Sequence, residues 1–281
     1  MLDFIKMQGT GNNYIYIDCM NKDLEQYNFS ELAKKISDVN YGIGSDGLIL
    51  ICRSLFADAK MIMYNKDGSE GKMCGNGIRC VGKYLYGKYY KRKKLYIETK
   101  SGIKEINLIV ENNEVTDIIV DMGKPILDPK MIPLNLDCEL VLNKKIVYEE
   151  QELYINCISM GNPHTVIFVD DVDAINLEYI YKIVNRSNIF ENECNVEIVQ
   201  VLDKNKIKLR VFERGSGETL SCGTGACASV VAGVLNRLLD WDTEIQVILK
   251  GGILYIKYSD TVYLKGPAEI ICKGKYLVKK Y

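Results

Sequence analysis

The chain has 281 residues, which on a prior of about 150 residues per domain indicates two domains. Its 36 Lys and Arg nearly balance 37 Asp and Glu, for a formal net charge of −1, which argues against nucleic acid as the main partner. Apolar residues at 47% and charged residues at 26% are typical of a globular protein and exclude a disordered, collagen-like or coiled-coil chain.

Targeting and membrane signals are not visible in the sequence. No run approaches the ~18 apolar residues of a membrane span. The first residues include an acid, Asp3, and lack the apolar segment of a signal peptide. We therefore expect a cytoplasmic protein with no membrane partner, in which the ten cysteines are thiols and most of them are small buried side chains.

Short runs with strand-like alternation, separated by turn residues, make up most of the chain. Helical patterns are few: Ser30 is placed to cap Glu31–Ile36, Gly75–Tyr86 has one apolar face, and Gly225–Leu239 is the longest. The last of these is nearly uncharged, which predicts a central helix buried on most sides. The expected strands are Tyr14–Cys19, Leu48–Cys52, Met61–Tyr64, Leu95–Thr99, Asp117–Met122, Leu153–Met160, Thr165–Val169, Val196–Leu202, Ile207–Phe212, Ile245–Leu249, Ile253–Tyr258 and Thr261–Lys265. Many strands and few helices predict the α+β class.

Three motifs recur in the same order, at offsets of 142 to 150 residues, just over half the chain. One such pair could arise from chance similarity of glycine-rich turns, but three in register indicate two copies of one domain. The pairs are Met73–Cys80 with Ser221–Cys227, Gly11–Asp18 with Gly161–Asp170, and Met122–Pro125 with Leu264–Pro267.

The repeated Cys-Gly-x-Gly motif carries the candidate chemistry. Cys74 and Cys222 each stand just before a helical pattern, where the first-turn N–H groups are unsatisfied and carry positive partial charge. Glycines there let a carboxylate approach the backbone, and the same field stabilises a thiolate, which becomes a usable base. The competing interpretation is a glycine-rich turn followed by a buried cysteine, and it explains one motif better than it explains two.

Two related halves commonly enclose a small-molecule cleft, so we expect the active site in the cleft between them. Opposed thiols suit inversion at carbon, since one removes a proton from one face and the other donates to the opposite face. A protease-like nucleophile is less favoured, because the single histidine, His164, would have to serve both cysteines. The spacings Cys74/Cys80 and Cys222/Cys227 match neither a resolving thiol pair nor a zinc site, so we expect no metal.

At the level of motifs the chain resembles the diaminopimelate epimerase family, cofactor-independent enzymes that interconvert LL- and meso-diaminopimelate in lysine and peptidoglycan synthesis. The matching segments run from residue 6 to residue 227, with one further segment near the end. They are Lys6–Asn12, Gly42–Gly47, Asn65–Glu70, Met73–Cys80, Met160–His164, Asn195–Val196, Arg210–Cys227 and Gly266–Ala268. The two cysteine motifs with their flanks are the specific part of this resemblance.

The resemblance implies roles for these residues. Cys74 and Cys222 would be the acid–base thiols, with His164 and Glu213 tuning them or orienting the substrate. The substrate-binding residues would be Asn12, Asn65, Gly75, Asn76, Asn162, Asn195, Glu213, Arg214, Gly223 and Thr224. The resemblance also implies no cofactor, a small-molecule substrate, and a fold of two β-barrel-like sheets, each around a central helix. It is compatible with a homodimer.

The resemblance further implies a division of the chain into residues 1–120 plus 266–281, with Cys74, and residues 121–265, with Cys222. Two positions depart from the family, which commonly has His at Gln8 and Asp at Asn13. Both flank the substrate-binding residues and leave the exact substrate open. The alternatives are an epimerase or racemase of another amino acid, such as lanthionine, and a non-catalytic amino-acid-binding relative.

Overall fold

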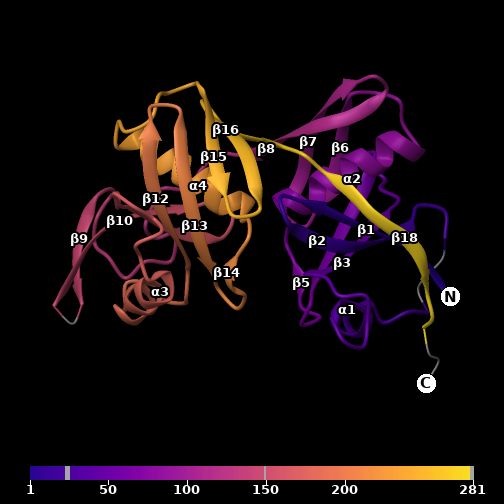
Figure 1. Ribbon diagram of the computed structural model, residues 1–281, viewed down its shortest axis with the longest axis horizontal. Helices are drawn as coiled ribbons and strands as arrows, with labels where there is room; N and C mark the ends of the chain where they lie inside the picture. Colours follow the sequence, from indigo (N-terminus) through magenta and orange to yellow (C-terminus); the bar gives the residue numbers. More distant parts are fainter. Residues whose placement is uncertain (23–25, 149, 279–281) are drawn as a thin grey trace. The chain divides into compact units, whose positions relative to one another are not determined.

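The computed structural model describes residues 1–22, 26–148 and 150–278, and within them the chain forms 18 strands and four helices (Figure 1). The chain divides into two compact units. Unit 1 contains Met1–Val120 and Gly266–Tyr281, and unit 2 contains Asp121–Lys265. No helix among the described residues is long and apolar enough to cross a membrane.

Unit 1 is a mixed sheet that packs against two helices. Its strands pair β1–β2 antiparallel, β2–β3 parallel, β3–β4 antiparallel, β4–β6 parallel and β6–β7–β8 antiparallel, with the short β5 beside β4. The elements are β1 (Leu2–Gly9), β2 (Asn12–Cys19), α1 (Phe29–Ser37), β3 (Gly47–Cys52), β4 (Ala59–Asn65), β5 (Glu70–Gly71), α2 (Gly75–Lys88), β6 (Lys94–Thr99), β7 (Gly102–Glu111), β8 (Glu114–Gly123) and β18 (Glu269–Tyr276).

Unit 2 repeats this pattern of pairings. Its strands pair β10–β11 antiparallel, β11–β12 parallel, β12–β13 antiparallel, β13–β15 parallel and β15–β16–β17 antiparallel, with β14 beside β13. The elements are β9 (Lys144–Tyr148), β10 (Gln151–Ser159), β11 (Pro163–Phe168), α3 (Leu177–Arg186), β12 (Asn195–Asp203), β13 (Lys206–Glu213), β14 (Gly217–Thr219), α4 (Gly223–Leu235), β15 (Glu244–Leu249), β16 (Gly252–Tyr258) and β17 (Val262–Gly266).

The predicted internal repeat is confirmed by the strand registers. Tyr16 lies opposite Ile49 where β2 meets β3, and Val166 lies opposite Glu197 where β11 meets β12. The crossover helix is α1 in the first case and α3 in the second. Each pairing therefore recurs at the offset that the sequence motifs indicate.

The segments after the third repeated motif close the two sheets in the same way. After β17 the chain forms β18, which pairs antiparallel with β1 along its length. After β8, Ile126 forms an isolated antiparallel bridge with Ser159 of β10. In both units, the segment that follows the Gly-Pro or Gly-Lys-Pro turn therefore lies beside the first strand of the repeat.

Two helices lie in the cores of the units. The face of α2 that contains Ile78, Val81 and Leu85 is fully buried, as its spacing predicts. Helix α4 is buried along most of its length and packs against β10, β11, β12 and β16. This confirms the prediction of a central buried helix, which follows from a sequence with no charged residue between Gly223 and Leu235.

Three helix predictions need correction. Asn28 caps α1 by accepting from the Glu31 N–H, whereas the Ser30 hydroxyl donates to the carbonyl of Gly68. Helix α4 begins at Gly223 and ends at Leu235, so it is shorter than α2. Helix α3 is missing from the sequence predictions, although Leu177, Ile183 and Val184 are buried, because its run of Tyr, Ile and Val residues favours a strand as much as a helix.

We predict opposite effects for two glycine-to-alanine substitutions in unit 1. A Cβ at Gly42 would lie 2.2 Å from the carbonyl oxygen of Lys35, so Gly42→Ala should destabilise the protein by about 1–3 kcal/mol. A Cβ at Gly87, near the end of α2, would meet nothing within 4 Å, so Gly87→Ala should stabilise by about 0.5–1 kcal/mol. Chemical unfolding of both variants measures the difference. Equal stability of the two variants would contradict the close contact between Gly42 and the last turn of α1, which contains Lys35.

Candidate active site

Both cysteines of the repeated motif are helix N-caps. Cys74 has extended backbone angles before α2, and its sulfur accepts from the Gly77 N–H at 3.4 Å. Cys222 caps α4 in the same way, and its sulfur accepts from the Gly225 N–H at 3.3 Å. In both motifs a sulfur therefore lies at the positive end of a buried helix, where negative charge is stabilised. The predicted position of both cysteines at helix starts is confirmed.

In unit 1 two asparagines lie beside Cys74. The Cys74 thiol donates to Oδ1 of Asn12 at 3.4 Å, and Nδ2 of Asn76 donates to the same oxygen at 3.4 Å. Nδ2 of Asn12 donates to a carboxylate oxygen of Asp46 at 2.8 Å, which fixes the orientation of the amide. The structure thus brings together Asn12, Cys74 and Asn76 from β2 and the start of α2.

A buried arginine holds this group in place. Arg79 is fully buried, and its guanidinium donates to Oδ1 of Asn76 at 2.9 Å and to Oγ1 of Thr10 at 3.0 Å. It also donates to the carbonyl of Gly75 at 3.1 Å and to the carbonyl of Pro267 at 3.1 Å. A structural role for Arg79 was not predicted from the sequence. The signal was an arginine between Ile78 and Cys80 in the apolar first half of α2, since arginine is seldom buried without such partners.

In unit 2 Cys222 is surrounded by ionisable groups. It is 5% exposed, and its sulfur lies 3.4 Å from Oγ1 of Thr224. Burial, together with the nearby carboxylates of Glu213 and Glu197, raises the pKa of the Cys222 thiol well above its usual range. Burial also raises the pKa of Glu213, whose carboxylate accepts a hydrogen bond from Thr219. Cys222 is therefore a thiol at neutral pH in this structure.

His164 lies next to a second acid that the sequence analysis did not select. Nδ1 of His164 is 2.7 Å from Oε1 of Glu197, and both side chains are 0% exposed. Glu197 is the third residue of β12 and lies in its buried first half. A charged residue inside a buried strand was the available signal, because burying a carboxylate without partners is unfavourable.

The remaining predicted residues lie at strand ends, one of them in unit 1 and the others in unit 2. Asn195, at the start of β12, accepts from the backbone N–H of Arg214 at 2.9 Å. Nη1 of Arg214 donates to the carbonyl of Glu193 at 3.1 Å, and the side chain is otherwise exposed. Asn162 precedes β11 and is half-buried, while Nδ2 of Asn65, at the end of β4, donates to Oγ of Ser69 at 3.0 Å. The structure therefore joins Asn195 with Arg214, but it bonds Asn65 to its own turn.

Both residues that depart from the family pattern have structural partners. Gln8 accepts from the Gly11 N–H at 2.8 Å and donates to a carboxylate oxygen of Glu269 at 2.9 Å. The backbone N–H of Asn13 donates to Asp46 at 2.8 Å. These contacts stabilise the β1–β2 turn and the start of β18.

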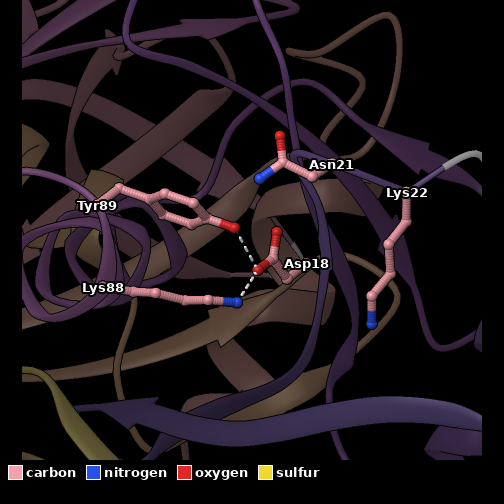
Figure 2. A pocket seen from close by; sticks show the side chains of 5 residues that line it. All are labelled: Asp18, Asn21, Lys22, Lys88 and Tyr89. Atoms are coloured by element: carbon pink, nitrogen blue, oxygen red, sulfur yellow. Dashed lines mark hydrogen bonds and ion pairs between the residues drawn. The ribbon is translucent and has the colours of Figure 1, made fainter.

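A pocket in unit 1 lies away from Cys74. It is lined by Asp18, Asn21, Lys22, Lys88 and Tyr89, at the end of β2 and the C-terminal end of α2 (Figure 2). Cys74 caps the opposite end of that 14-residue helix, about 20 Å away at 1.5 Å per residue. Figure 2 shows the Tyr89 hydroxyl and the Lys88 ammonium pointing at one oxygen of Asp18. This pocket contains none of the predicted site residues.

No metal centre is visible in the described part of the chain. Within residues 1–22, 26–148 and 150–278, no three His, Cys, Asp or Glu side chains are grouped as metal ligands. The side chains at the two helix starts supply thiols, carboxylates, amides and an imidazole, beside backbone N–H groups.

Comparisons with known sequences agree on one family. The family model described as diaminopimelate epimerase matches residues 4–127 and 156–271. The chain is 45% identical over 276 residues to the diaminopimelate epimerase of Acetivibrio thermocellus, covering 97% of both chains. It is 44% identical over 284 residues to that of Oceanobacillus iheyensis, covering 99% of both.

Solved structures with low sequence identity share the fold. A phenazine biosynthesis protein of the PhzF family from Bacillus anthracis superposes with a TM-score of 0.71 at 18% identity, covering 99% of both chains. A probable proline racemase from Agrobacterium radiobacter gives a TM-score of 0.72 at 10% identity, covering 99% of this chain and 94% of that one. The predicted α+β fold is confirmed.

The cluster around Asp18 generates a pH prediction. Burial alone would raise the pKa of Asp18, but hydrogen bonds from Lys88, Tyr84 and Tyr89 outweigh it and hold the pKa at about 2, below the ordinary 3.8. The cluster therefore contributes stability above pH 3.8 that is lost as the pH falls through about 2. Asp18→Asn should destabilise by about 1 kcal/mol at pH 7, a value reduced by solvent screening of this partly exposed cluster.

Urea unfolding of wild type and Asp18→Asn between pH 7 and pH 2 measures this contribution. The stability difference should shrink towards the acid end. The exposed Asp260→Asn in unit 2 is the control and should change stability little at any pH. A difference between wild type and Asp18→Asn that grows on acidification would contradict the assignment.

Proposed function

The chain belongs to the diaminopimelate epimerase family, and from that premise we propose that it interconverts LL- and meso-diaminopimelate without a cofactor. As an amino-acid epimerase it removes the proton from one α-carbon and returns a proton to the opposite face. The observation that carries the proposal is that two cysteines cap two helix starts at equivalent positions of a repeated topology. Inversion by proton transfer requires one such group for each face of the carbon.

The helix starts supply the carboxylate site of the proposed complex. The N–H groups of Gly75 and Asn76 at α2, and of Gly223 and Thr224 at α4, belong to first helical turns, where intrahelical acceptors are missing. Such N–H groups bind carboxylates well. When the substrate α-carboxylate binds to them, the α-carbon is positioned next to the two thiols. The N–H groups also stabilise the negative charge of the carboxylate while the carbanion forms.

Each turnover in this mechanism begins with one thiolate and one thiol. The thiolate removes the α-proton as the thiol on the other face donates its own, so the two cysteines exchange protonation states. Cys222, whose pKa is raised by burial and two carboxylates, is the proton donor of the resting protein. Glu213 and His164 are in unit 2 with Cys222, and in this mechanism they modulate the protonation of its thiol.

The distal amino-acid head of the substrate is assigned to polar residues at strand ends. Arg214 presents an exposed guanidinium, a fork that matches a carboxylate with two parallel hydrogen bonds. Its backbone is fixed by Asn195. Asparagine amides both donate and accept, so they suit a head that carries an ammonium and a carboxylate. We assign this role to Asn12, Asn65, Asn162 and Asn195.

A chiral separation of reaction products tests the proposal. LL-diaminopimelate incubated with the purified protein should yield meso-diaminopimelate, and the reverse reaction should approach the same mixture. Lanthionine and single-headed amino acids are run in parallel, since Arg214 would lack its carboxylate partner with the latter. Faster inversion of another amino acid would favour the racemase alternative. Binding without inversion of any substrate would indicate a non-catalytic relative.

Removing either thiol should stop epimerisation. We predict that Cys74→Ala and Cys222→Ala each lower kcat by at least about 10²–10⁴-fold, because each removes the proton transfer on one face. Halide release from substrates with a β-halogen needs only one proton removal. Each variant should therefore still process one β-halo isomer and spare the other.

Cys272→Ala is the matched control, because Cys272 is an exposed cysteine on β18. It should keep wild-type activity in both assays. Epimerisation near the wild-type rate by either Cys74→Ala or Cys222→Ala would exclude the two-base mechanism.

Arg214 should determine the preference for a two-headed substrate. Arg214→Lys keeps the positive charge and loses the planar fork, so we expect KM for diaminopimelate to rise about tenfold with a smaller change in kcat. Arg237→Lys, at a turn after α4, is the control and should leave both constants unchanged. An unaltered KM in Arg214→Lys would remove Arg214 from the distal site.

A further inference from the structure

Unit 2 contains a fully buried acid–imidazole pair. His164 on β11 and Glu197 on β12 are both 0% exposed, with Nδ1 and Oε1 2.7 Å apart. A contact this short between fully buried groups is typical of a charge-assisted hydrogen bond. The catalytic roles assigned above include His164 but give nothing to Glu197.

The contacts indicate one protonation state of His164. An ionised carboxylate only accepts hydrogen bonds, so the proton lies on Nδ1. Among the described residues, Nε2 of His164 and Oε2 of Glu197 have no hydrogen-bond partner, although both atoms are buried, so the Nδ1–Oε1 contact is the one that joins the pair. An N–H at Nε2 would be a buried donor without an acceptor, which is more unfavourable than a lone pair there. The contacts therefore favour the tautomer in which Nδ1–H donates to Oε1 of Glu197 and Nε2 keeps its lone pair.

The carboxylate of Glu197 lies against the start of α4. A Cβ built on Gly225 would lie 2.5 Å from Oε1 of Glu197, so the glycine is what lets the carboxylate approach the helix. The N–H of the same Gly225 donates to the Cys222 sulfur. Glu197 and Cys222 thus both lie against the first turn of α4. The Glu197 carboxylate contributes to the raised pKa of the thiol, although burial and Glu213 contribute more.

The titratable groups around Cys222 come from four segments. Glu213 is on β13, His164 on β11 and Glu197 on β12, while Cys194 directly precedes β12. Burial raises the pKa of Cys194 well above its usual range, so this thiol stays protonated. The carboxyl groups that face Cys222 are those of Glu213 and Glu197.

The repeat supplies an internal comparison. Ile49 occupies the position in unit 1 that matches Glu197. Ile49 on β3 pairs with Tyr16 on β2, as Glu197 on β12 pairs with Val166 on β11. A Cβ on Gly77, the equivalent of Gly225, would lie 2.6 Å from Cδ1 of Ile49. The same space beside the same helix turn is thus filled by an apolar side chain in unit 1. Packing alone therefore does not require a carboxylate in unit 2.

We propose that Glu197 is a positioning residue of the Cys222 site, where it holds His164 in the Nδ1–H tautomer and keeps a negative charge beside the thiol. The inference deepens the proposed epimerase function and rests on it for its catalytic consequence. The consequence is that Cys222 retains its proton until it meets the carbanion. Ile49 provides no such charge to Cys74, so the two thiols differ although their helices match.

Nitrogen NMR of wild type tests the tautomer without any substitution. His164 is the single histidine of the chain, so tag-free protein labelled with ¹⁵N-histidine gives one imidazole to observe. At pH 7.5 we expect a protonated Nδ1 and an unprotonated Nε2. A proton on Nε2 alone, or protons on both nitrogens, would overturn the proposal.

Two variants test the charge. Glu197→Gln keeps an acceptor for His164 and removes the charge, and Glu197→Ile copies the residue of unit 1. In both variants we expect the pKa of the Cys222 thiol to fall by about one unit. Halide release from the β-halo isomer that reacts through Cys222 should then rise about tenfold at pH values below the inflection of its pH–rate profile. The other isomer should be unaffected. In the NMR experiment Glu197→Gln should keep the Nδ1–H tautomer and Glu197→Ile should lose it.

Glu244→Gln, on β15, is the matched control, since its carboxylate is 48% exposed and pairs with Lys265. It should change neither halide release nor the imidazole. An unchanged pH profile in folded Glu197→Gln or Glu197→Ile would overturn the proposal. Wild-type protein that releases no halide from either isomer would instead refute the proposed function, and the NMR result would still decide the role of Glu197.

Discussion

In each unit the first turn of a buried helix leaves backbone N–H groups without acceptors inside the helix, and a cysteine sulfur caps that turn. The surrounding sheet is built around this constraint. Gly77 and Gly225 have no room for a Cβ, because the side chains of Ile49 and Glu197, respectively, occupy that space. The thiol and the carboxylate site of the proposed mechanism thus both depend on one feature of local structure.

The two copies of this feature are alike in backbone and different in charge. The last residue of β4 is Asn65 and the last residue of β13 is Glu213, so amide and carboxylate occupy matching strand ends. In unit 1 the polar groups around Cys74 are amides held by Asp46 and Arg79. In unit 2 they include two carboxylates and an imidazole. In the proposed mechanism the duplicated domain provides two bases, and its divergence lets them start in different protonation states.

Local chemistry made much of this predictable from the sequence. The glycines after Cys74 and Cys222 indicate helix starts, and the repeat indicates equal folds for both halves. Glu197 was not predicted, because its contact with His164 depends on the pairing of two strands separated by α3. Arg79 was overlooked for a related reason, since its acceptors come from the β1–β2 turn, α2 and the segment before β18. Long-range pairing is what the sequence pattern does not contain.

The central claim is that two different thiols act on opposite faces of one α-carbon. Epimerisation of LL-diaminopimelate in deuterium oxide, sampled at low conversion by mass spectrometry, tests it most directly. The thiols exchange with solvent between turnovers, so the donor delivers deuterium while the base can only return the proton that it removed. We predict deuterium in the meso product and none in the recovered LL substrate. Deuterium appearing equally in both isomers would show a single base that exchanges with solvent and would contradict the account.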